Sequence, residues 1–482
     1  MGNNGHHQLN KVSAAGLLIT LGIIYGDIGT SPLYVMKSIV GKSPINSEVV
    51  LGAISLIIWT LTLQTTIKYV LLTLRADNKG EGGIFALYTL VRRSKKRWLL
   101  IPAIIGGSML LADGIITPPI SVASAVEGLA VFGVGQHDVI PIVIGILVFL
   151  FFVQQFGTGF IGKSFGPIML VWFSMLAILG VTNIFCDFGI LKALSPHYAV
   201  NLIMNPPEGY QPMLLLGAVF LCTTGAEALY SDLVHCGRKN IRVSWMFVKT
   251  ALVLNYMGQG AWLMQHENML MSDFAGGNPF YSMMPGWFNA AGIIIATAAA
   301  VVASQALISG SFTLINEAIR LNLWPKVRIK YPTVLKGQLY IPSLNWMLML
   351  GCVGVVLYFK ESGAMEAAYG LAIVITMLMT TILLSYYLLM KRHSIVFVVG
   401  LLVVYLFIES LFLIANLEKF AHGGFITVFI ALTLIAIMWI WYDARKIRNR
   451  YVEFVKISDY LPLLDALKED KSVSKFATHL VY

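Results

Sequence analysis

Apolar runs long enough to cross a bilayer recur along the whole chain and limit what it can fold into. A transmembrane helix needs about 20 mainly apolar residues. Runs of this kind lie at 13–40, 48–74, 99–131, 137–156, 166–186, 211–234, 243–265, 288–318, 341–359, 363–390, 394–416 and 422–443. Charged residues make up only 12% of the 482 residues, against about 25% in soluble globular proteins. We therefore expect an all-α polytopic membrane protein with twelve transmembrane helices.

The distribution of positive charge between these runs predicts the orientation of the chain. Lys and Arg are retained on the cytoplasmic side of a membrane, and they gather in the even-numbered connections, whereas 265–287 has none. Two shorter apolar segments, 83–93 and 190–204, are expected to lie along the interface. The expected organisation is a cytoplasmic N-terminus at 1–12, a transmembrane domain at 13–443 and, at 444–482, the beginning of a cytoplasmic C-terminal region that looks truncated. Both termini are then cytoplasmic, in a protein of the cell membrane.

Composition argues against several other classes of protein. The net charge of +10 is spread between apolar runs, so lipid rather than nucleic acid is the expected partner. The four cysteines have no paired spacing that would indicate a disulfide framework or a zinc site. The segment "NKGEGG" at 78–83 lacks the Lys-Ser or Lys-Thr pair of a phosphate-binding loop. We expect neither an enzyme nor a bound cofactor.

The first apolar run contains a carboxylate in a stretch that should not hold a regular helix. Asp27 lies within "YGDIGTSPLY", where glycines and Pro32 weaken the helix. An opened helix at membrane depth is tolerated where it lines a cavity or is buried in protein. A kink packed against a neighbouring helix is the simpler alternative, but a kink alone does not need Asp27. We therefore expect the first span to open around Asp27.

Two other spans carry polar groups at membrane depth. In the third span, Asp113, Thr117 and Ser121 follow one another at intervals of four residues, so they share one helix face. The alternative is that these hydroxyls bond only their own helix backbone. The sixth span contains "TTGAE", where Thr224 and Glu227 flank a glycine, and it resembles the first span. Broken first and sixth spans are typical of a 5+5 inverted repeat with its site at the midplane, followed here by two extra helices.

The oxygen atoms gathered in these spans suit a hard cation. They come from one carboxylate, the hydroxyl groups of the three spans and opened main-chain carbonyls; the side chains are Asp27, Tyr34, Thr117, Ser121 and Thr224. One carboxylate among neutral oxygens favours a monovalent over a divalent ion, and a soft metal would need His or Cys. Burial favours the protonated form of a carboxylic acid. Glu127 and Glu227 are therefore candidates for carrying a coupled proton.

Two lysines at membrane depth need partners. We expect Lys68 and Lys249 to form structural ion pairs with acids such as Asp113 or Asp232.

Five segments together resemble the Kup/HAK/KT family of potassium uptake permeases. They are "YGDIGTSPLYV", "NKGEGGIFALYTLVRR", "ADGIITPPISVASAVEGL", "TTGAEALYSD" and "VASQALISGSF", which follow one another in the family's order across the membrane region. The segment "SDLVHCG" departs from the family's usual "ADMGHFG" at the inner end of the sixth span.

The resemblance implies a LeuT-like fold of the amino acid, polyamine and organocation superfamily and import of potassium together with a proton. It places potassium at Asp27, Tyr34, Thr117, Ser121 and Thr224, and it matches Glu127 and Glu227 to membrane acids, with Asp113 as a further proton-coupling candidate. It also implies a homodimer and nucleotide regulation through the C-terminal region. The alternatives are a potassium channel, although no "TVGYG"-like filter is present, and an amino acid permease of the same fold, whose substrate carboxylate Asp27 would repel.

Overall fold

The architecture is entirely helical in the part of the chain that the structure describes. The computed structural model describes residues 12–78, 80–156, 162–274, 276–331, 339–452 and 456–470, and no β-strand occurs among them. The expected N-terminal segment, apart from Val12, and the last residues of the expected C-terminal region lie outside this part.

The helices follow one another along the chain with short connections. From the first to the sixth apolar run they are α2 (Ala14–Ile24), α3 (Gly26–Thr30), η1 (Ser31–Leu33), α4 (Val35–Val40), α5 (Ser47–Thr60), η2 (Leu61–Leu72), η3 (Thr73–Arg75), α6 (Ile84–Val91), η4 (Arg92–Ser94), η5 (Arg97–Leu99), α7 (Leu100–Val126), η6 (Glu127–Phe132), α8 (Gln136–Gln154), α9 (Gly162–Ile184), η7 (Phe188–Leu194), α10 (Pro196–Met204), α11 (Pro212–Phe220), η8 (Leu221–Thr223), α12 (Ala226–Ser231) and α13 (Leu233–Cys236). The remainder are α14 (Arg238–Met264), η9 (Met271–Asp273), α15 (Pro279–Ser282), α16 (Asn289–Arg320), α17 (Pro342–Phe359), α18 (Ser362–Met390), α19 (Ile395–Glu418), η10 (Phe420–His422), α20 (Gly424–Arg450), η11 (Ile457–Tyr460) and α21 (Leu461–Glu469).

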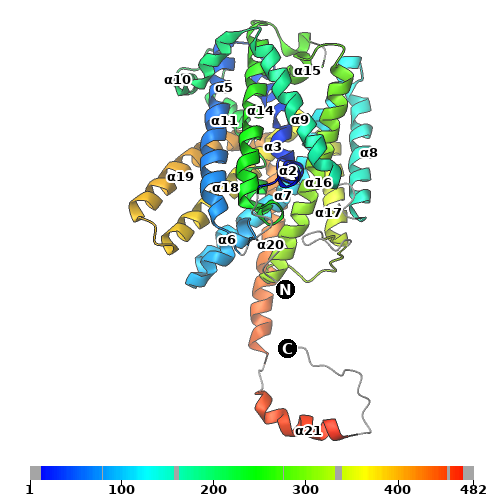
Figure 1. The fold of residues 1–482 in the computed structure, drawn as a ribbon, viewed down its shortest axis with the longest axis vertical. Helices are drawn as coiled ribbons and strands as arrows, with labels where there is room; N and C mark the ends of the chain where they lie inside the picture. Colours follow the sequence, from blue (N-terminus) through cyan, green and yellow to red (C-terminus); the bar gives the residue numbers. More distant parts are fainter. Residues whose placement is uncertain are drawn as a thin grey trace.

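Helix α7 forms the centre of the bundle, and other helices surround it. It packs against α16, α17, α18 and α20, while α9 packs against α14 and α2 (Figure 1). In the apolar stretches of the spans containing α7 and α18, 83% of the residues are buried, against 28% for α8, α19 and α20. The polar residues of the inner helices therefore face protein, and the outer helices present apolar faces, as a lipid environment requires.

Ten helices of the described part are long and apolar enough to cross a membrane, and the bent pair at the N-terminus raises this to eleven. The expected number was twelve, and each of the twelve apolar runs does coincide with helix. The exception is α14, which is long enough but carries Lys249, Asn255 and Gln259 within its middle section. These polar groups lower the hydropathy of α14, so it is not among the helices that are apolar enough to cross a membrane.

The first and sixth spans are both interrupted, as their sequences predict. The axis turns by 69° between Ala14–Ile24 and Gly26–Leu33, with Tyr25 at the bend. The bend thus lies ahead of Pro32, which is the second residue of η1. In the sixth span, η8 ends at an extended Thr224 and α12 begins after Gly225 at φ 83°. By contrast, α7 runs unbroken through Pro118 and Pro119.

The structure adds detail on two segments outside the main spans. Six of the eight residues of α6 are buried, and this helix, which the sequence places along the interface, packs against α7 and α18. The last helix of the bundle, α20, continues as a helix to Arg450, past the expected end of the transmembrane domain at 443, and projects from the body in Figure 1.

Candidate functional site

The breaks in the first and sixth spans meet in space. A Cβ atom on Gly225 would lie 2.7 Å from the main-chain nitrogen of Ile28 and 3.1 Å from Oδ2 of Asp27. Only a glycine permits this approach, because a side chain would collide with these atoms and because the backbone has a positive φ at this position. The main chain of the sixth span therefore lies directly against the carboxylate of the first span.

Asp27 is buried with one of its two carboxylate oxygens unused. The residue is 3% exposed. Its Oδ1 accepts a hydrogen bond of 2.9 Å from the hydroxyl of Tyr369 on α18. Its Oδ2 accepts none from the residues that the structure describes. A buried carboxylate oxygen without a donor is energetically costly, so this oxygen is suited to bind a cation.

Three hydroxyl groups form a second set of oxygens between the same two spans. The Oγ of Ser31 lies 2.9 Å from Oγ1 of Thr224, and the Oη of Tyr34 lies 3.2 Å from it. Thr224 donates its own hydrogen to the main-chain oxygen of Leu221, at 2.9 Å. The Oγ of Ser31 also lies 3.3 Å from the Oη of Tyr34, and either hydroxyl can be the donor in each of these pairs. The three oxygens can therefore turn lone pairs toward a cation.

The polar face of the third span lies against the opened first span. Thr117 donates a hydrogen bond of 2.8 Å to Oδ1 of Asp113, one helical turn away, which confirms that these two residues share a face. The Oγ of Ser121 lies 3.3 Å from Oγ1 of Thr30, which in turn donates to the main-chain oxygen of Asp27 at 2.9 Å. Asp113 is within electrostatic reach of Asp27.

Three surrounding side chains hold the opened segment in place by its main-chain oxygens. Trp172 on α9 donates to Gly29 at 2.9 Å, and Gln259 on α14 donates to Pro32 at 3.1 Å. The third donor is Asn278, immediately before α15, which donates to Leu33 at 2.7 Å. Gln259 is one of the polar residues that make α14 less apolar than the other long helices. It thus supplies a hydrogen bond in place of one that the break removes.

The two glutamates proposed for proton coupling have different surroundings. Glu127 does not continue the polar face of α7; it begins η6, and its Oε2 lies 2.8 Å from Nζ of Lys37. It also accepts hydrogen bonds from the main chain and the hydroxyl of Ser362, at 2.8 and 2.6 Å. Glu227 accepts hydrogen bonds from Tyr69 and from Thr380, the latter at 2.8 Å, and has no cationic partner among the described hydrogen bonds.

The expected partners of the two membrane lysines are wrong. Lys68 forms its ion pair with Glu409 on α19 and donates to the main-chain oxygen of Met377 at 2.9 Å. Lys249 donates to the hydroxyl of Thr62 at 2.9 Å and has no ion pair within the described residues. Sequence spacing could not reveal the Lys68 pair, because its members are 341 residues apart.

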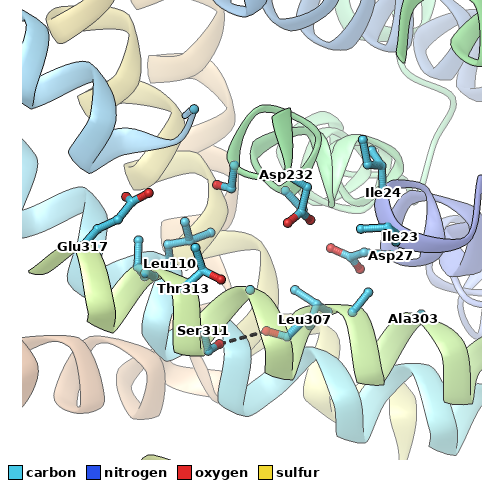
Figure 2. Close-up of a pocket in the computed structure, with 16 residues that line it drawn as sticks. Ile23, Ile24, Asp27, Leu110, Asp232, Ala303, Leu307, Ser311, Thr313 and Glu317 are labelled. Carbon is cyan, nitrogen blue, oxygen red and sulfur yellow. Dashed lines mark hydrogen bonds between the residues drawn. The ribbon is translucent and has the colours of Figure 1, made fainter. Parts of the chain in front are cut away.

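A cavity of about 40 Å³ begins at Asp27, enough for more than one water molecule. One face of α16 lines it from Ala303 to Glu317, which corresponds to about 20 Å of helix. Figure 2 shows the carboxylates of Asp27, Asp232 and Glu317 arranged around it. The cavity therefore leads from the break in the first span toward the end of the bundle where α16 finishes.

The structure pairs Tyr34 with Thr224 and places Ser121 beside Thr30 of the opened segment. Thr117 bonds to Asp113, which is within electrostatic reach of Asp27.

The structure also adds residues that the sequence did not single out. Ser31 and Thr30 lie inside the opened segment, so the break itself was a signal for them. Tyr369 lies in the middle of an apolar span and has no local signal; only the fold places it beside Asp27.

The helical bundle, with its apolar outer helices and a polar interior around two broken spans, defines a multi-pass membrane protein. A family model described as "K+ potassium transporter integral membrane domain" matches residues 14–446. The chain therefore belongs to this potassium transporter family, as the five sequence segments indicate.

Relatives of known name agree with this assignment. A "Probable potassium transport system protein Kup" of Flavobacterium johnsoniae is 62% identical over 482 residues, which cover 99% of this chain and 73% of the relative. The protein of the same name from Clostridium perfringens is 51% identical over 487 residues, covering 98% of this chain and 74% of the relative. Among solved structures, a mutant manganese transporter of Eremococcus coleocola aligns over 92% of this chain and 97% of its own chain, at 12% identity and a TM-score of 0.44.

Proposed function

We propose that this protein imports potassium by secondary active transport, as a potassium:proton symporter that works by alternating access. The observation that carries the proposal is Oδ2 of Asp27, a buried carboxylate oxygen that no described residue hydrogen-bonds, placed where two broken helices meet. The names of the relatives, which are potassium transport system proteins, support the choice of ion.

The ligand set supports a monovalent ion in particular. Asp27 provides one negative charge, and the hydroxyls of Tyr34 and Thr224, joined by that of Ser31, provide neutral oxygens beside it. Thr117 and Ser121 line the same region from the third span. A divalent ion would call for two or three carboxylates in direct contact.

The arrangement also supports a LeuT-like fold with cytoplasmic termini in the cell membrane. We infer that α14 crosses the bilayer despite its composition, because its polar side chains face α9 and the opened first span. Twelve spans then result, arranged as an inverted repeat of five helices with two extra helices. In Figure 1 the basic segments at α6 and at the end of α20 lie at one end of the bundle, and α15, from a segment free of Lys and Arg, lies at the other.

On this orientation the cavity beside Asp27 leads to the cytoplasm. It follows α16 toward Arg320, at the basic end of the bundle. On the other side of Asp27, the ion pair of Lys37 and Glu127 ties the first span to the third, and Ser362 ties the tenth span to the same carboxylate. We infer an inward-facing state in which these contacts close the outer entrance.

Transport measurements on the purified protein in liposomes test the proposed function. We expect rubidium to accumulate above its electrochemical equilibrium when an inward proton gradient is imposed, and potassium, but not amino acids, to compete. Rubidium that only equilibrates would indicate a channel and contradict the proposal. Inhibition by amino acids would indicate a permease of the same fold.

A further inference from the structure

A second polar cluster lies behind the broken sixth span, away from the hydroxyl groups around Asp27. It contains one base and two acids, all buried: Lys68 from η2, Glu227 from α12 and Glu409 from α19. The segment η2 is a π-helix, a form that is rare and frequently found at functional sites. This cluster joins the sixth span to one of the two helices beyond the inverted repeat.

The hydrogen bonds identify Glu409 as the charged partner of Lys68. Its Oε1 accepts from Nζ of Lys68, and Thr381 donates to both carboxylate oxygens, at 3.0 and 2.9 Å. Both oxygens therefore act as acceptors. A carboxylate with a cation and hydrogen-bond donors around it is stabilised in its ionised form.

Glu227 has a different set of contacts. Its Oε1 accepts from the hydroxyls of Tyr69 and Thr380, while Oε2 has no partner among the described residues. In the part of the chain that the structure describes, no lysine or arginine bonds to Glu227, although Lys68 is within electrostatic reach. An ionised carboxylate would leave a buried charge without a counter-ion, and a proton on Oε2 removes that charge.

A count of charges in the cluster leads to the same result. One lysine balances one carboxylate, so two acids and one base are neutral only when one acid holds a proton. Buried charges without a partner are strongly unfavourable. Since Lys68 already pairs with Glu409, the proton belongs to Glu227.

Within the described ranges, no other charged group pairs with Lys68 or with Glu227. Tyr69 of η2 and Thr380 of α18 face Glu227 as neutral donors, and Glu409 of α19 is the other acid within electrostatic reach. On α16, Glu317 is within electrostatic reach of Tyr230 and Asp232, and Tyr230 is also within reach of Glu227 as a neutral group. Changes in the charge of Lys68 or Glu409 should therefore act on Glu227 first.

We infer that Lys68 and Glu409 form a fixed charge pair whose function is to leave Glu227 free to take up and release the coupled proton. Lys68 and Glu409 are positioning residues in this scheme, and they give the eleventh span a role in coupling. The inference rests on the proposed proton-coupled uptake.

The decisive variants are Glu409→Gln and the double variant Lys68→Met/Glu409→Gln. Glu409→Gln removes the partner of Lys68, so Glu227 becomes its counter-ion and stays ionised. We expect stimulation of rubidium uptake by an inward proton gradient to fall about tenfold or more. In the double variant no cation holds Glu227 ionised, and we expect the stimulation to return to within about threefold of the wild-type protein.

The rescue distinguishes this inference from two others. If the pair only stabilises the fold, both variants yield less protein but respond normally to the proton gradient. If Glu409 itself carries the proton, the double variant stays uncoupled. Either result overturns the inference. If rubidium uptake by the wild-type protein does not change with the proton gradient, the proposed coupling and the inference are both overturned.

Glu227→Gln provides a measurement that does not depend on variants with unpaired charges. It mimics the neutral form of Glu227 and leaves Lys68 paired with Glu409, so the protein should fold normally. We expect uptake that no longer responds to the proton gradient, while equilibrium binding of rubidium stays within about threefold of the wild-type value. A normal response to the gradient in this variant overturns the inference.

Discussion

At the scale of single residues, Asp27 owes its properties to its neighbours. Tyr369 fixes one of its oxygens, and Gly225 brings the sixth span against the other side. The hydroxyls of Tyr34 and Thr224 add neutral oxygens without a second charge. A cation that binds here exchanges its water for these oxygens and supplies the missing partner of Oδ2.

The hydroxyl of Thr224 can be removed without a change in side-chain volume. Thr224→Val loses an oxygen that contacts both Ser31 and Tyr34. We expect the rubidium concentration for half-maximal binding to rise about tenfold, since a hydrogen bond to a charged site is worth ~1.5 kcal/mol or more.

Thr224→Ser is the matched control because it keeps the hydroxyl. We expect its half-maximal rubidium concentration to stay within about twofold of the wild-type value. Equal affinities in the valine and serine variants would show that this oxygen is not a ligand.

The sequence singles out residues of the candidate site more readily than it predicts their partners. Asp27 and Thr224 stand out because charge and glycine interrupt apolar runs, and those interruptions are local. Tyr369 and Glu409 act through contacts across hundreds of residues. The pairing of Lys68 was mispredicted for this reason, since a single chain gives no measure of which distant acid comes near.

At the scale of elements, the site depends on two helices that stop in the same place. Each break leaves main-chain groups without their helical partners, and such groups must be satisfied inside a membrane. Trp172, Gln259 and Asn278 satisfy three oxygens of the first span. The opened segment is thus held rigidly, which keeps its oxygens in position for an ion.

The junction between the two broken helices should not tolerate a side chain at Gly225. Gly225→Ala combines a positive φ with a contact of 2.7 Å to the nitrogen of Ile28. We expect a loss of about 3 kcal/mol or more in stability, seen as a lower melting temperature of the purified protein, together with loss of rubidium binding.

Gly209→Ala is the control for backbone strain alone. Gly209 has a similar φ of 86°, but nothing lies within 4 Å of its Cβ position. We expect a loss of only about 1 kcal/mol and normal rubidium binding. Equal effects at the two glycines would contradict the close approach of the helices.

The positions of the breaks illustrate what sequence can and cannot predict about elements. Clustered glycines and Pro32 marked the first break correctly, yet the bend falls at Tyr25, where tertiary contacts decide the geometry. Pro118 and Pro119 lie inside the third span, yet α7 continues through them. A centrally packed helix can keep its course past a proline, because its neighbours hold it in place.

At the scale of the whole molecule, the inner helices carry the polar groups and the outer helices carry the apolar surface. This division follows from the bilayer, which offers no hydrogen bonds to exposed polar groups. It also explains the lower hydropathy of α14, since its Gln259 and Asn255 form hydrogen bonds inside the bundle. Orientation in the membrane then rests on the charges at the two ends.

A native cysteine can test this orientation. Cys186 is exposed at the end of α9, whereas Cys222, Cys236 and Cys352 are buried. The connection after α9 is expected outside, so a membrane-impermeant maleimide should label intact cells, and Cys186→Ser should abolish the labelling. Labelling that requires permeabilised cells would reverse the orientation and contradict cytoplasmic termini.

The central claim is that Asp27 binds the transported ion, and equilibrium binding of rubidium to the purified protein tests it most directly. Asp27→Asn keeps the size of the side chain and its acceptor for Tyr369 but removes the charge. We predict saturable binding to the wild-type protein, competed by potassium, and a loss of affinity of about a hundredfold or more in the variant. An Asp27→Asn protein that is folded and binds rubidium as the wild-type protein does would contradict the account.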